Sequence, residues 1–143
     1  RIAMDQGYLG GDRCSVRVRL EGEIAMLNIK SREAGAQRIE FEYPIPVQDA
    51  KDMLARLAGP RVTKMRHHVI VDGALFEVDE FAGANAGLIV AEIELDAVDA
   101  AFPRPDWLGR EVTDDVRFYN LRLAETPFST WPDRVALIEE IAC

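Results

Sequence analysis

The sequence predicts a single domain of the α+β class, mainly β, with one helix inserted among antiparallel strands and a helical C-terminal end. Three observations predict it. Seven runs have the alternation or residue types typical of strands. Two of these runs flank an Asp-Gly pair, which is typical of a tight hairpin. The 143 residues contain no linker, repeat or low-complexity tract, so residues 1–143 are expected to form one domain.

The predicted strands are bounded by turn residues. They cover residues 3–9, 14–21, 23–31, 36–43, 62–71, 74–81 and 88–95. Gly22 and Asp72-Gly73 indicate tight turns between neighbouring strands. Pro44 ends the fourth run. The order predicts a mostly antiparallel sheet.

Helices are predicted after the fourth strand and beyond the last one. Pro46 begins the first, which continues to about residue 57 and places Ala50, Met53 and Leu54 on one face, together with Leu57. Residues 96–102 are expected to form one or two helical turns. Residues 113–124 and 132–142 are expected to form two helices, each with Asp or Pro near its start.

Five of the strands carry two like-charged residues at a spacing of two. The basic pairs are Arg17/Arg19 and Lys64/Arg66, and the acidic pairs are Glu40/Glu42, Glu77/Asp79 and Glu92/Glu94. Because side chains alternate along a strand, each pair projects from one face and the apolar residues between take the other. Strands sorted by sign in this way indicate a surface that holds a polyanion through basic side chains and a divalent metal.

The charged faces either meet bulk water or line the inside of a sheet that closes on itself. A closed up-and-down barrel favours an even number of strands. Since the chain begins with Arg1 rather than Met, an eighth strand is expected upstream of it. The apolar faces then need cover, which the helices supply from outside.

The composition of the chain limits the classes of ligand that it is expected to bind. Lys and Arg number 17 against 25 Asp and Glu, a net charge of −8. This charge argues against binding of nucleic acid or anionic membranes, so the basic side chains are expected to gather in a concave site. No apolar run is long enough to span a bilayer. Cys14 and Cys143 lack the spacing of a disulfide framework or metal site, which favours a reduced, cytoplasmic protein.

Nine segments, in order, carry a family resemblance. They are YL at 8–9, VRVRL, NIK, RIEFEYPIP, VTKMRHHV, LFEVDEF, GANAGLIVAEIEL, WLGREVT and RFYN. This set resembles the CYTH superfamily, the triphosphate tunnel metalloenzymes, in its short bacterial adenylate-cyclase-like branch. The resemblance extends to about Phe128. It implies a closed eight-stranded antiparallel β-barrel tunnel, although the family's N-terminal ExExK strand has no counterpart in this chain.

The resemblance also implies roles for individual residues. The substrate-binding set is Arg17, Arg19, Lys30, Lys64, Arg66 and Tyr8. The ligands of Mg²⁺ or Mn²⁺ are Glu92, Glu94, Asp79 and Glu77. The catalytic carboxylates, which neutralise basic neighbours or position water, are Glu42 and Glu40. Tyr8 either hydrogen bonds to substrate or packs in a core, and His67 and His68 are interpreted as surface or packing residues.

The predicted function is divalent-metal-dependent hydrolysis of triphosphate compounds, with inorganic tripolyphosphate as substrate and phosphate as product. Positioning and charge neutralisation supply most of the catalysis in such a reaction. The alternatives within enzymes are a class IV adenylyl cyclase and a thiamine triphosphatase. A non-catalytic module that binds polyphosphate or nucleotide is the alternative of another class. The expected partners are a small polyanionic substrate, such as tripolyphosphate or a nucleoside triphosphate, and a second copy in a homodimer.

Overall fold

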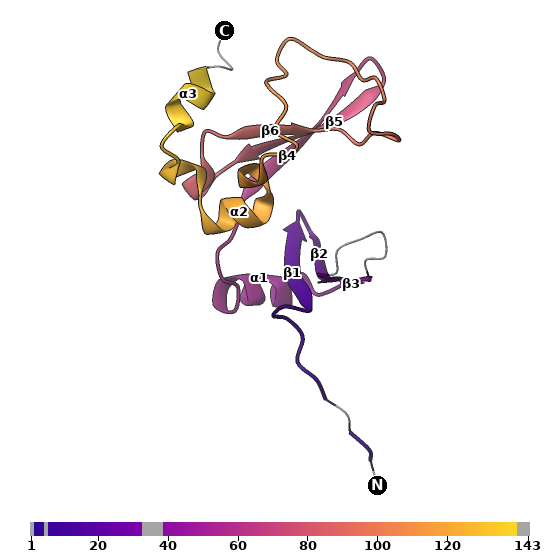
Figure 1. Cartoon of the computed structure of the whole chain (residues 1–143). Coiled ribbons are helices and arrows are strands. Elements are labelled where there is room, and N and C mark those ends of the chain that lie inside the picture. The colour runs from indigo at the N-terminus through magenta and orange to yellow at the C-terminus, as the bar shows by residue number, and fades with distance from the viewer. Residues whose placement is uncertain (1, 5, 33–38, 140–143) are drawn as a thin grey trace. The chain divides into compact units, whose positions relative to one another are not determined.

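The computed structural model describes residues 2–4, 6–32 and 39–139 (Figure 1). The chain divides into two compact units, Arg1–Gly59 and Pro60–Cys143. Each unit contains a three-stranded antiparallel sheet, in the order β1-β2-β3 in the first unit and β4-β5-β6 in the second.

The sheet of the first unit has β2 at its centre. The elements are β1 (Cys14–Glu21), β2 (Ile24–Ser31), β3 (Glu40–Pro44) and the helix α1 (Val47–Arg56). Gly22 has φ +59° in the turn between β1 and β2, a conformation that glycine adopts without steric cost. The register therefore pairs neighbours in sequence, as the turn predicted.

Helix α1 packs on β1 and β2 (Figure 1). Ala50 of α1 is fully buried and Ala25 of β2 is almost so. Met53 and Leu54 are half-buried, as expected for one apolar face. Leu57 follows the last helical residue and is 80% exposed, so the predicted face ends one turn earlier.

The sheet of the second unit has β5 at its centre. Its strands are β4 (Lys64–Val71), β5 (Ala74–Phe81) and β6 (Ile89–Glu92). Asp72 and Gly73 both have positive φ, +48° and +82°, between β4 and β5. Two consecutive residues of this kind form the hairpin turn that matches strand twist, which confirms the predicted Asp-Gly hairpin.

One short helical segment lies between β5 and β6, and the others follow β6. They are η1 (Gly83–Asn85), η2 (Val116–Phe118), α2 (Asn120–Glu125), η3 (Phe128–Thr130) and α3 (Arg134–Glu139).

These segments build the core at one end of the second sheet. Its buried members are Phe81, Leu88, Leu123, Phe128 and Trp131. Asn85 is buried beside them, where its Nδ2 donates to the Leu123 carbonyl (3.2 Å) and its Oδ1 accepts from the Phe128 N–H (2.7 Å). One side chain thus satisfies backbone groups of two helical segments.

The predicted closed eight-stranded barrel is wrong for the residues that the structure describes. Closure requires every strand to have two partners, whereas hydrogen-bonded pairing is limited to two sheets of three strands. The predicted strand at 3–9 has no strand pairing at its described residues 3–4 and 6–9. Without that strand, and with both sheets ending in edge strands, the even-number argument loses its basis.

Several element boundaries also differ from prediction. β6 ends at Glu92 rather than residue 95, and residues 96–102 form bends and a turn rather than helix. The predicted helix at 113–124 divides at Tyr119, whose φ and ψ of −70° and 139° are extended. Residues 36–38 and 140–142 of the predicted elements lie outside the described residues. None of the described helices has the length and apolar character needed to cross a bilayer.

Candidate functional site

Alternation along β4 and β5 places charged side chains together on one face of the second sheet. Arg66 lies opposite Asp79 and His68 opposite Glu77 in the register. Lys64 occupies the same face one step further along β4. Because partners in register share a face, β4 presents a basic column and β5 an acidic one.

Arg66 is at the centre of this face. Its Nε and Nη2 donate to Asp79 Oδ1 and Oδ2 at 2.7 and 2.8 Å. Its Nη1 donates to Glu77 Oε2 at 2.5 Å, and Nη2 also reaches Glu92 Oε2 at 3.1 Å. A planar guanidinium with its donors in a fixed fork suits such a multiple contact. One cation therefore pairs with three carboxylates from β5 and β6.

Asp79 is the buried anion of the cluster. Its side chain is 1% exposed, and Lys64 is its second cationic partner. Burial raises the pKa of Asp79, but hydrogen bonds from Arg66 and Lys64 lower it by more, so the net pKa lies below its usual range. The same contact with Asp79 raises the pKa of Arg66. Both groups stay charged at neutral pH.

Glu77 and Glu92 are direct partners across β5 and β6. Like charges directly opposite one another destabilise a sheet unless a cation lies between them. Arg66 supplies that cation in this structure. His68 Nε2 lies 3.6 Å from Glu77 Oε1, so this histidine belongs to the charged face. The alternation along β4 puts His68 on the face of Arg66 and His67 on the opposite face.

The charged face of the first sheet has the same alternation with looser contacts. Lys30 Nζ lies 3.3 Å from Glu40 Oε1, and Arg19 Nη2 lies 3.5 Å from Glu42 Oε1. Arg17 is exposed and forms no ion pair with any residue that the structure describes. The cations of this face are therefore held less firmly than those of the second sheet.

Asn28 is the polar anchor of the first sheet. It is 2% exposed, and its Nδ2 donates to Glu40 Oε1 at 2.7 Å. This bond, followed by the one from Lys30, lowers the pKa of Glu40. The predicted site did not include Asn28. Its position between Met26 and Lys30 on the even-numbered face was the signal that could have found it.

Ten of the twelve predicted site residues lie on these two charged faces. The first face carries Arg17, Arg19, Lys30, Glu40 and Glu42, and the second carries Lys64, Arg66, Glu77, Asp79 and Glu92. Glu94 is exposed two residues beyond the end of β6. Tyr8 is fully exposed in a segment without regular structure.

The donor set on the second sheet fits a hard divalent cation in its chemistry. Glu77 and Glu92 offer facing carboxylate oxygens, the ligands that Mg²⁺ prefers, and phosphate oxygens of a substrate would complete the coordination. Within residues 2–4, 6–32 and 39–139, no group of three or more His, Cys, Asp or Glu is arranged to hold a metal ion. The carboxylates are spaced around Arg66 instead.

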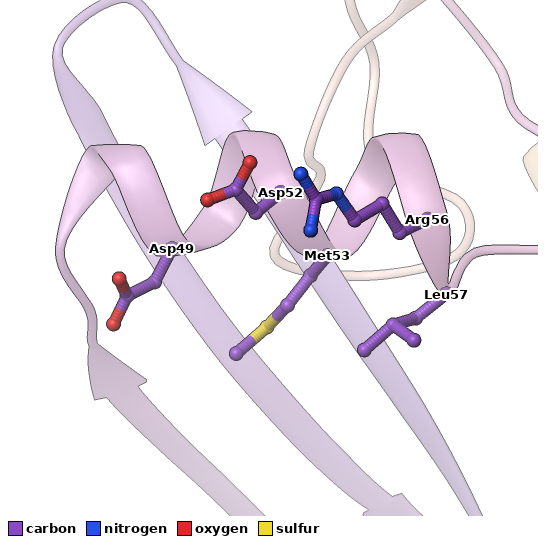
Figure 2. A pocket seen from close by; sticks show the side chains of 5 residues that line it. All are labelled: Asp49, Asp52, Met53, Arg56 and Leu57. Carbon is purple, nitrogen blue, oxygen red and sulfur yellow. The ribbon is translucent and has the colours of Figure 1, made fainter.

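A pocket of the first unit involves a different set of residues. Figure 2 shows its lining side chains on α1 and the residue after it: Asp49, Asp52, Met53, Arg56 and Leu57. None of the predicted site residues lines it. Acidic and basic groups three and four apart are ordinary on an exposed helix face, so this pocket is not the candidate site.

Two relatives resemble the chain over most of its length. It is 42% identical over 130 residues to a protein named inorganic triphosphatase from Acetivibrio thermocellus, a match covering 90% of this chain and 83% of that protein. It is 38% identical over 128 residues to an inorganic triphosphatase from Nitrosomonas europaea, covering 86% and 84%. No protein-family model matches the chain, and no solved structure matches it.

Proposed function

The chain belongs to the inorganic triphosphatase family, and we propose that it hydrolyses inorganic triphosphate to phosphate and diphosphate. The observation that carries the proposal is the charged face of the second sheet, where Lys64 and Arg66 interleave with Glu77 and Glu92. Such a face offers cations to the substrate and oxygen ligands to a metal. The finer assignment to the short CYTH branch rests on the ordered motifs of the sequence.

Phosphate binding is assigned to basic side chains on each sheet, taken separately. On the second sheet, Arg66 binds phosphate oxygens bidentately and Lys64 acts as a point charge. On the first sheet, the corresponding cations are Arg17, Arg19 and Lys30. Arg17, which has no ion pair to break among the described residues, is the most readily available of them.

Metal binding is assigned to Glu77 and Glu92, with Asp79 beside them. When bound, Mg²⁺ or Mn²⁺ neutralises charge on the phosphoryl oxygens. Glu77 and Glu92 offer their Oε2 atoms to a metal only if Arg66 releases them, since its guanidinium contacts the Oε2 of each carboxylate. Asp79 keeps Lys64 as a partner after that release.

Hydrolysis requires a water oxygen to attack the terminal phosphorus while the phosphoanhydride bond breaks and diphosphate leaves. Glu40 and Glu42 on the first sheet are the carboxylates proposed to orient that water. The lowered pKa of Glu40 makes it a weak proton acceptor, so orientation rather than deprotonation is its expected role. Glu42, held by one contact of 3.5 Å to Arg19, is the more available base.

Phosphate release from tripolyphosphate tests the proposal. We expect release with Mg²⁺ or Mn²⁺ and its loss on chelation with EDTA. ATP serves as the comparison substrate, with both phosphate and cyclic AMP measured. Cyclic AMP from ATP would instead establish a cyclase, and tight tripolyphosphate binding without phosphate release would establish a binding module.

A further inference from the structure

We propose that Arg66 competes with the divalent metal for Glu77 and Glu92, so that metal binds this face tightly only after Arg66 has moved onto a phosphate group. The inference rests on the proposed function, because the phosphate comes from the substrate. Arg66 thereby becomes a positioning residue that couples metal binding to substrate binding, in addition to contacting phosphate.

The guanidinium of Arg66 occupies the space between the carboxylates of Glu77 and Glu92. Glu77 and Glu92 face each other across two strands, and a cation that bridges them has to lie between their oxygens. Arg66 donates one hydrogen bond to each of these carboxylates, from Nη1 to Glu77 Oε2 at 2.5 Å and from Nη2 to Glu92 Oε2 at 3.1 Å. A metal that uses the same oxygens cannot bind while both contacts exist.

Arg66 can leave without removing the last cationic partner of the buried Asp79 carboxylate. Asp79 is 1% exposed, and leaving such an anion without a cation would be costly. Lys64 contacts Asp79 independently, and its Nζ is further placed 5.6 Å from the centre of the Phe81 ring. After Arg66 moves, Lys64 therefore still pairs with Asp79, whereas Glu77 and Glu92 need a new cation.

A phosphate group can replace the carboxylates as the hydrogen-bond acceptor of Arg66. A phosphate group accepts the same two parallel hydrogen bonds that Asp79 accepts from Arg66. Hydrogen bonds to the substrate phosphate thus replace those that Arg66 loses. The metal replaces Arg66 as the cation that pairs with the two glutamates. Because such coupling is reciprocal, each ligand increases the affinity for the other.

Manganese binding in the absence of any phosphate tests the proposal, read from the electron paramagnetic resonance signal of free Mn²⁺. Arg66→Gln removes the competitor and is expected to bind Mn²⁺ about five- to tenfold more tightly than the wild type. The charge-matched control is Arg122→Gln in α2, whose side chain pairs with Glu125. It loses the same charge without freeing Glu77 or Glu92, so its affinity should stay near that of the wild type.

A second pair of variants identifies the ligands. Adding Glu92→Gln to Arg66→Gln should abolish the gain. Arg66→Lys keeps the charge but cannot span three carboxylates, and it should also bind Mn²⁺ more tightly than the wild type. It serves as the readout if Arg66→Gln does not fold.

Equal Mn²⁺ affinity in Arg66→Gln and Arg122→Gln would overturn the proposal, as would the absence of Mn²⁺ binding in all variants. Wild-type release of phosphate from tripolyphosphate is measured alongside. Turnover combined with unchanged Mn²⁺ binding rejects this inference alone. No turnover combined with tighter Mn²⁺ binding in Arg66→Gln rejects the proposed hydrolase and leaves the competition at Glu77 and Glu92 in place.

Discussion

The two sheets carry the same alternation of charge but hold it at different strengths. In the second sheet, Arg66 Nε lies 2.7 Å from Asp79 Oδ1, and the Asp79 side chain is 1% exposed. In the first, Arg19 and Glu42 are 48% and 40% exposed and lie 3.5 Å apart. Exposed pairs of this kind contribute little to stability, whereas a buried anion depends on its partners. The charged face of the second sheet therefore contributes to the stability of the fold, whereas that of the first sheet contributes little.

Replacing the buried anion should produce the largest effect on stability. Asp79→Asn leaves Lys64 and part of Arg66 without an anionic partner. We expect a loss of about 2–4 kcal/mol in the free energy of unfolding, at or below the range for broken buried pairs because both cations are partly exposed. Urea denaturation measures it. The matched variant on the first sheet is Glu42→Gln, which should change stability by less than about 0.5 kcal/mol; equal losses would remove the distinction between the sheets.

Replacing each of the two buried asparagines should also destabilise the second unit more than the first. Asn85→Ala leaves a buried N–H at Phe128 and a carbonyl at Leu123 without their partner, so a loss of about 2–3 kcal/mol is expected. Asn28→Ala removes a bond to the solvent-accessible Glu40, and about 1 kcal/mol is expected. Thermal unfolding compares them. A larger loss for Asn28 would make the first sheet the more strongly organised one.

A substitution on the charged face of the first sheet should lower activity without lowering stability. Arg19→Ala is expected to lower phosphate release from tripolyphosphate about tenfold or more, because a cation proposed to bind the substrate phosphates is lost. Its exposed ion pairs predict almost no change in unfolding. Phosphate assays and urea denaturation are run on the same preparation, with Arg122→Gln as control. Wild-type turnover in Arg19→Ala would contradict the assignment of Arg19 to phosphate binding.

The smallest expected difference is in pH dependence. The pKa of Asp79 is lowered in the folded state, so its stabilising contribution is present above the unfolded value of 3.8 and is lost as pH falls through the folded pKa. When denaturation is measured from pH 5 downwards, the free energy of unfolding should therefore fall more steeply with pH in the wild type than in Asp79→Asn below about pH 4. Parallel curves would mean that Asp79 gains no stabilisation from its cations.

Local features were predictable because they depend on neighbours in sequence. The alternation fixed which residues share a face, and the register places Arg66 opposite Asp79 and Glu77 opposite Glu92 accordingly. The hairpin at Asp72-Gly73 follows from backbone sterics of two residues. These predictions needed no knowledge of how distant strands associate.

Long-range features were not predictable from the same patterns. Closure into a barrel depends on pairing between strands far apart in sequence, for which alternation carries no signal, and the prediction was wrong. Glu94 continues the alternation of Glu92, yet the ladder stops at Glu92 and leaves Glu94 outside it. Asn85 acts on backbone groups about forty residues away, and nothing in the loop around it indicated these partners.

Strand β5 carries two incompatible environments on its two faces. Phe76 is 1% exposed and packs edge-on against Trp107 with ring centroids 5.4 Å apart, whereas Asp79 lies on the opposite face among cations. A slip of one residue would exchange these faces. It would set a carboxylate against the indole and a phenyl ring among the charges. We therefore expect β5 to tolerate neither insertion nor deletion along its length. The same strand register is needed both for the packing of Phe76 and for the ion pairs of Asp79.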